Sequence, residues 1–82
     1  MRLLWDERKR LANIVKHGMD FAELDVGFFL DAPAVRSVRS GRFMGIGKFN
    51  GVIVSVVYSM LGAEGISVIS MPPASVRERS LI

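Results

Sequence analysis

The dipeptide Asn50-Gly51 constrains the fold of this chain more than any other feature. Asparagine followed by glycine readily takes the two left-handed conformations of a tight hairpin turn. The flanking residues 42–49 and 52–60 have the alternating pattern of β-strands, and the second segment is rich in valine. We therefore predict a hairpin whose second strand lies in the centre of a sheet.

Two further segments complete an antiparallel meander of about four strands. They are residues 35–38 and 66–70, and Ser40-Gly41 forms the turn after the first of them. Pro72-Pro73 ends the sheet, because a proline has no N–H to donate to a ladder. Ser75 and Glu78 then have the spacing of a capping box, which predicts a short helix over residues 76–82.

A short strand over residues 2–5 and a helix over residues 7–17 precede the meander. Asp6 is a good N-cap for this helix, and Gly18 stands where a helix favours a left-handed residue. At roughly 100° per residue, three apolar side chains share one face of the helix, which we expect to be buried, with a mostly basic face opposite. These apolar residues are Leu11, Ile14 and Val15.

A second helix is predicted over residues 21–29. Asp20 and Glu23 have the positions of an acidic capping box at its start, and Asp31-Ala32-Pro33 closes it. The predicted fold class is therefore α+β, with a short strand and two helices before the meander and a short helix after it.

The composition restricts the kind of protein. With 82 residues, half of them apolar, the chain forms one domain, residues 1–82. It has no cysteine and one histidine, so we expect no metal and no cofactor. The most apolar run, residues 52–61, is too short to span a bilayer, so we expect a cytoplasmic protein with no membrane partner. The net charge of +3 suits a nucleic acid or an acidic partner.

Several residues have both a structural and a functional interpretation. Lys16 and His17 suit the last turn of a helix, where positive charge is favourable, but they are also candidates for catalysis. Tyr58 belongs at the edge of the core or stacks on a base. Gly45 and Gly47 lack the spacing of a phosphate-binding loop and instead predict close packing of a helix on their strand.

The order of motifs resembles one known family. The pattern W-D-x-x-K-x-x-x-N-x-x-K-H-G-x-x-F is similar to the opening signature of the BrnT toxins. The later segments 42–47 and 66–70, the valine-rich strand ending in Tyr58, and residues 77–79 also resemble that family, so the similarity covers nearly the whole chain. The signature residues are Trp5, Asp6, Lys9, Asn13, Lys16, His17, Gly18 and Phe21.

This resemblance implies a RelE-like fold and a ribonuclease toxin of a type II toxin–antitoxin system. Such a toxin cleaves RNA without a metal. It is neutralised by a ribbon-helix-helix antitoxin, and it reaches operator DNA only through that antitoxin. The residues available for the chemistry, without an assignment of acid and base, are Lys16, His17, Arg42, Tyr58 and Arg77, with Lys9, Lys48 and Arg79 for RNA binding.

One position departs from the family pattern. Members usually carry a basic residue shortly after the "IS" of the last strand, whereas this chain has Ile69-Ser70-Met71-Pro72. Three interpretations follow: an active toxin, a weakened or inactive homologue that binds the antitoxin and tunes repression, and a plain nucleic-acid-binding domain. The last predicts salt-sensitive RNA binding without cleavage.

Overall fold

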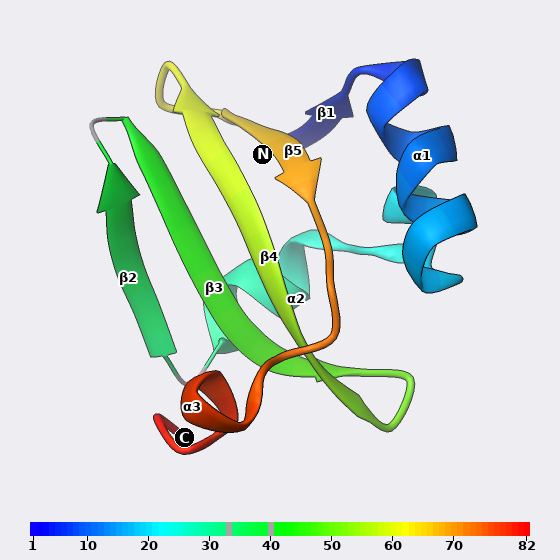
Figure 1. The fold of residues 1–82 in the computed structure, drawn as a ribbon. Helices are drawn as coiled ribbons and strands as arrows, with labels where there is room; N and C mark the ends of the chain where they lie inside the picture. Colours follow the sequence, from blue (N-terminus) through cyan, green and yellow to red (C-terminus); the bar gives the residue numbers. More distant parts are fainter. Residues whose placement is uncertain (33, 40) are drawn as a thin grey trace.

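The structure, a computed structural model, describes residues 1–32, 34–39 and 41–82. Its elements follow the order strand, helices, strands and helix (Figure 1). No helix in this described part of the chain is long and apolar enough to cross a membrane. In chain order the elements are β1 (Arg2–Trp5), α1 (Glu7–His17), the 3₁₀ turn η1 (Phe21–Glu23), α2 (Val26–Asp31), β2 (Ala34–Arg39), β3 (Arg42–Phe49), β4 (Val52–Leu61), β5 (Gly65–Ser70) and α3 (Val76–Arg79).

The strands form one five-stranded sheet in the order β1-β5-β4-β3-β2. Strands β2 to β5 pair antiparallel with their neighbours in the chain, as the meander prediction requires. The predicted strand over residues 2–5 is confirmed as β1, and it pairs with β5 in parallel, which makes the sheet mixed. Residues 2–5 are apolar enough to join the sheet, but nothing local in the sequence identifies a partner more than sixty residues away.

The core lies on one face of the central strand β4. Val54 and Val56 are fully buried there against Phe21 and Leu24, so the prediction of a central second hairpin strand is confirmed. The Asn50-Gly51 turn is also confirmed, with φ of 49° and 80° at its two residues. Helix α2 lies on this core face, while α3 lies on the opposite face (Figure 1).

Glycine at position 45 allows α2 to approach the sheet closely, as the sequence predicts. A Cβ atom at this position would lie 3.5 Å from the Tyr58 ring and 3.8 Å from Phe28 and Ala32. These are ordinary contact distances, so a side chain longer than a methyl group would displace α2.

The predicted helix over residues 21–29 is wrong in extent, because two capping aspartates divide it. Asp20 accepts from the N–H of Ala22 and begins the turn η1, and the chain returns to an extended conformation at Leu24. Asp25 then accepts from the N–H of Phe28 and begins α2. Of the predicted closing segment, Asp31 ends α2 and Ala32 caps it.

Two other predictions involve residues outside the described part. Pro33 and Ser40 lie outside it, so only Gly41 of the predicted Ser40-Gly41 turn is described, with φ of 74°. The terminal helix begins at the predicted capping box of Ser75 and Glu78 but ends at Arg79 instead of residue 82.

The burial of α1 differs from the prediction, because only Ile14 of its three apolar residues is partly buried. Leu11 is 51% exposed and Val15 is 87% exposed, so these two side chains do not contribute to the core. The face toward the protein instead carries Asn13, which is buried, and Arg10, which is partly buried. These polar groups are tolerated because each finds a partner in a neighbouring segment.

Gly18 ends α1 in the left-handed conformation, with φ of 69°, and its N–H donates to the carbonyl of Ile14. A Cβ atom at this position would meet nothing within 4 Å, so a substitution is opposed by the backbone conformation alone. We expect Gly18→Val to lower the free energy of unfolding by about 1 kcal/mol or more. Gly18→Asn should lower it less, because asparagine tolerates this region. Urea unfolding measures both, and equal stabilities of Gly18→Val and the parent would contradict the cap.

Candidate functional site: a cationic hollow beside the sheet

Five residues of the N-terminal signature have structural roles. Asp6 caps α1 by accepting from the N–H of Arg8 at 2.8 Å, and Gly18 ends the same helix. Phe21 is fully buried in the core, and Trp5 packs against that core. Asn13 joins α1 to the segment that follows β5. The packing of the fold thus accounts for these five positions.

Asn13 is the most tightly bound of these side chains. Its amide donates to the carbonyls of Met19 and Met71, at 3.0 and 3.1 Å. Its oxygen accepts from the N–H of Met71 at 2.9 Å. One buried side chain therefore satisfies three backbone groups and fixes the end of β5 against α1.

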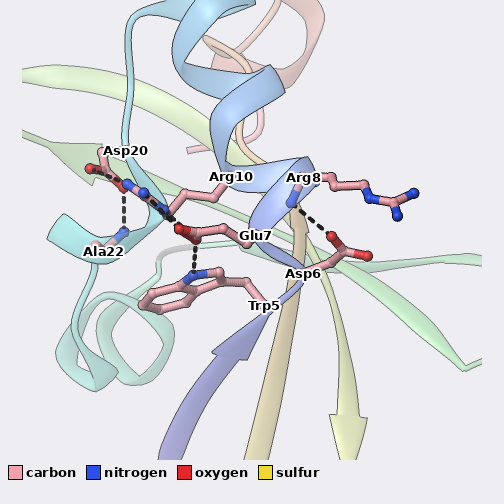
Figure 2. A network of polar contacts seen from close by, with 7 residues as sticks. All are labelled: Trp5, Asp6, Glu7, Arg8, Arg10, Asp20 and Ala22. Carbon is pink, nitrogen blue, oxygen red and sulfur yellow. Dashed lines mark hydrogen bonds and ion pairs between the residues drawn. The ribbon is translucent and has the colours of Figure 1, made fainter.

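A second polar group ties the start of α1 to the segment after it (Figure 2). Arg10 lies between Glu7 and Asp20, with N···O distances of 2.6 and 3.0 Å, and the indole of Trp5 donates to Glu7 at 3.3 Å. The hydrogen bond from Arg10 lowers the pKa of Glu7, while the N–H of Ala22 and then Arg10 lower the pKa of Asp20. These two carboxylates raise the pKa of Arg10. Arg10 is thus a structural cation that is already paired.

The three remaining signature residues, Lys9, Lys16 and His17, gather at one place. They line a hollow of about 230 Å³ between α1 and the end of β5, together with Ala12, Asn13, Ile69 and Ser70. None of the three side chains has an ion-pair or hydrogen-bond partner within residues 1–32, 34–39 and 41–82. The helix-end interpretation explains the charges of Lys16 and His17 but not their shared location with Lys9.

A β-bulge forms the other wall of the hollow. Val57 pairs with Ser70 and Tyr58 pairs with Val68, so Ile69 is an extra residue in β5. Bulges bend a strand and change the direction of its side chains, and they are common beside active sites. Here the bulge turns Ile69 and Ser70 toward the basic side of α1.

The sheet face opposite the core carries a row of polar side chains that the sequence analysis missed. Arg42 pairs with Ser59, and Ser59 pairs with Ser67, so the three lie side by side on one face. All three are partly exposed. Arg39 pairs with Arg42 and extends the row onto β2. The alternation of serines with the buried Val56 and Tyr58 along β4 is the signal that could have identified this face.

Other predicted site residues lie farther from the hollow. Tyr58 is on the core face, packed against Phe29 and Phe43, and burial raises the pKa of its hydroxyl. Its position favours the core-edge interpretation, and the structure does not bring it together with Arg42. Lys48 is exposed at the far end of β3.

Arg77 and Arg79 are exposed on α3, whose position is fixed by Glu78. The Glu78 carboxylate accepts from the N–H of Ser75 and the hydroxyl of Ser55, both at 2.8 Å. These bonds, that of the Ser75 N–H first, lower the pKa of Glu78. Helix α3 is therefore held on the same sheet face as Arg42.

Comparisons with known proteins agree with the signature. The sequence profile described as "Ribonuclease toxin, BrnT, of type II toxin-antitoxin system" matches residues 5–78. The 1.1 Å crystal structure of the Brucella abortus ribonuclease toxin BrnT superposes with a TM-score of 0.85 at 50% identity, covering 92% of this chain and 97% of that one. The chain belongs to the BrnT family. A search among curated proteins gave no match.

Membership of the BrnT family places the chain among ribonuclease toxins of type II toxin–antitoxin systems. Such a toxin implies an antitoxin partner and an RNA substrate. The prediction of the family from eight signature residues is confirmed, and so is the α+β class.

The position at which this BrnT chain departs from the family pattern comes two residues after Ser70, which lines the hollow. Val54 bridges to Pro73 on the core side, and Met71 is fully buried, so Pro72 between them points to the opposite face by alternation. The Pro72 carbonyl accepts from the N–H of Ser55 at 3.0 Å. Position 72 therefore shares its sheet face with Ser70 and Arg42.

A larger hollow of about 500 Å³ lies between α2 and the β3–β4 hairpin. Its wall contains the carboxylates Glu23, Asp25 and Asp31, with Lys48 as its only cation among the lining residues. This mostly negative wall repels phosphate, so the smaller, cationic hollow is the better candidate for contact with RNA.

Proposed function

We propose that this chain is a toxin that cleaves RNA phosphodiester bonds without a metal ion, at the hollow formed by α1 and the bulge of β5. One observation carries the proposal. The signature residues that the fold does not use, Lys9, Lys16 and His17, line the same hollow. These unpaired cations can bind the phosphates of an RNA backbone. They lie beside the bulge of β5 and beside the sheet face that carries Arg42, Ser59 and Ser67, which we call the open face.

The reaction needs no external reactant. The 2′-oxygen of a ribose attacks the adjacent phosphorus and loses its proton to a base. The bond from phosphorus to the 5′-oxygen breaks, and an acid protonates that oxygen. The products are a 2′,3′-cyclic phosphate and a 5′-hydroxyl end. A base, an acid and cations around the negatively charged phosphorane are the groups required.

The residues of the hollow and the open face can fill these roles. An imidazole accepts or donates a proton near neutral pH, so we assign proton transfer to His17. Lys16 and Arg42 stabilise the charge of the phosphorane, and Lys9 holds an adjacent phosphate. Ser70 lies between the residues of the hollow and those of the open face, since it lines the hollow and pairs with Val57 on the open face.

The cations of α3 extend this surface. Arg77 and Arg79 are candidates for contacts with phosphates farther along the RNA, because α3 is held on the Arg42 face. Lys48 is a further candidate at the end of the same strand as Arg42. Such contacts position the substrate without reading its sequence.

The remaining parts of the proposal follow from the family. The fold is RelE-like, the protein acts in the cytoplasm, and a ribbon-helix-helix antitoxin neutralises it and links it to operator DNA. A second function has one observation in its favour. Pro72 supplies no cation on the open face, which supports a weakened homologue that still binds its antitoxin.

Cleavage of a radiolabelled RNA by the purified protein, in the presence of EDTA, tests the proposal. We expect His17→Ala to lower the rate by about 10²-fold or more, with a smaller loss for Lys16→Ala and Arg42→Ala. Arg8→Ala is the matched control, because this exposed cation neighbours Lys9 without lining the hollow. Equal losses in Arg8→Ala and His17→Ala would contradict the site, and no cleavage by the parent would favour the weakened homologue.

A further inference from the structure

The outward face of α1 carries an apolar ridge that faces solvent, with the exposed Arg8 beside it. Val15 is 87% exposed and Leu11 is 51% exposed, and Ala12 beside them is also exposed. Leu11 and Val15 are four residues apart, so they form the kind of ridge that packs into the groove of another helix. Hydrogen bonds from Asn13 to the backbone of Met71 compensate for the burial of the polar inward face of α1. The apolar ridge, in contrast, packs against no other part of the described residues.

The ridge and the cationic hollow are neighbours on the same helix. At roughly 100° per residue, Arg8 and then Ala12 lie next to the Leu11–Val15 ridge, and Lys16 and Lys9 come next around the helix. Ala12, Lys9 and Lys16 also line the hollow. A helix packed on the ridge would therefore reach over the two lysines with one of its flanks.

We propose that the ridge of Leu11 and Val15 docks an amphipathic helix of the antitoxin, with acidic residues on the flank that faces Lys9 and Lys16. The inference rests on the toxin–antitoxin role and specifies how neutralisation occurs. The docked helix covers the entrance of the hollow and occupies the lysines that RNA would contact. RNA and the antitoxin then compete for the same cations.

The positive charges of α1 favour an acidic helix as the partner. Glu7 is the only acid of α1, and it is already bound to Arg10. A second copy of this chain is a poor occupant, because a symmetric pairing of the two ridges brings the lysines of both copies close together. An acidic helix instead gains complementary contacts along the same flank.

The test uses the protein encoded by the reading frame adjacent to this gene as the probe, with calorimetry to measure the Kd. We expect Leu11→Glu/Val15→Glu to weaken binding by about 30-fold or more, since two central apolar contacts are replaced by charges that repel an acidic flank. Val15→Arg should weaken it less, because the added positive charge attracts the acidic flank. Leu30→Glu on α2, where the leucine is 74% exposed, is the matched control and should bind like the parent.

A parent-like Kd for Leu11→Glu/Val15→Glu would overturn the docking site, and so would an equal loss in Leu30→Glu. Concentration-dependent dimers of the parent that the double substitution dissociates would show that a second copy occupies the ridge. The readout separates this inference from the ribonuclease proposal, because affinity is measured without RNA. If the parent cleaves no RNA but Leu11→Glu/Val15→Glu weakens binding of the probe, the ribonuclease proposal fails and the docking site stands.

Discussion

Arginine in place of Pro72 should raise the rate of RNA cleavage by roughly 10²-fold. Position 72 lies on the open sheet face, between Ser70 and the residues that hold α3. A guanidinium there can make two parallel hydrogen bonds to phosphorane oxygens, whereas proline offers neither charge nor donor. Cleavage of a labelled RNA by the two proteins, at equal concentration and salt, measures the gain.

The fold should tolerate this change. The carbonyl of residue 72 still accepts from the N–H of Ser55, and the Ser75–Glu78 cap of α3 is untouched. Arginine also restores an N–H to the segment that runs beside β4. Pro72→Leu is the matched control, because it removes the proline without adding a cation. Equal gains in Pro72→Leu and Pro72→Arg, or none in Pro72→Arg, would refute the role of the missing charge.

Asn13→Ala should lower the free energy of unfolding by about 3 kcal/mol, because it leaves buried backbone groups without partners. The carbonyl and the N–H of Met71 lose their bonds, and the carbonyl of Met19 loses a donor. Denaturation in urea, followed by circular dichroism, measures the change.

Leu11→Ala on the same helix provides the control for Asn13→Ala. Leu11 is exposed, so its truncation should change the stability by no more than about 0.5 kcal/mol. The loss of stability should therefore be larger for Asn13→Ala than for Leu11→Ala. The amphipathic pattern of α1 alone would predict the opposite order. A larger loss for Leu11→Ala than for Asn13→Ala would mean that α1 is oriented as the sequence pattern predicted.

The features that could be predicted from the sequence are those with a local cause. Asp6 and Gly18 mark the ends of α1 because a side-chain acceptor and a left-handed residue act within one turn of the helix. Asn50-Gly51 defines its hairpin for a similar reason.

The orientation of α1 could not be predicted, because it depends on distant partners. The pattern favoured burial of Leu11 and Val15, but Asn13 pairs with the backbone of Met71, 58 residues later, and Arg10 pairs with Asp20. Hydrophobic periodicity contains no information about such pairs. The hollow has the same origin, since Lys16 and Ser70 meet only when α1 lies beside β5.

The position of Ser59 and Ser67 beside Arg42 could not be predicted for a different reason. The alternation of serines with buried residues along β4 indicates a polar face, but only the register of three neighbouring strands aligns these two with Arg42. The membership of the BrnT family, in contrast, was readable from fixed residue types at fixed spacing, most of which turn out to cap or fill the fold.

The parallel pairing of β1 with β5 also affects how the protein is made. Arg2 to Trp5 leave the ribosome well before their partners Gly65 to Val68, which lie about sixty residues later in the chain. The loop closed by this pairing is long, so the two ends meet late in folding. Both walls of the cationic hollow depend on that meeting, because α1 follows β1 directly and the bulge belongs to β5. A nascent or prematurely terminated chain therefore lacks the assembled hollow. The complete site forms only after synthesis has passed residue 70.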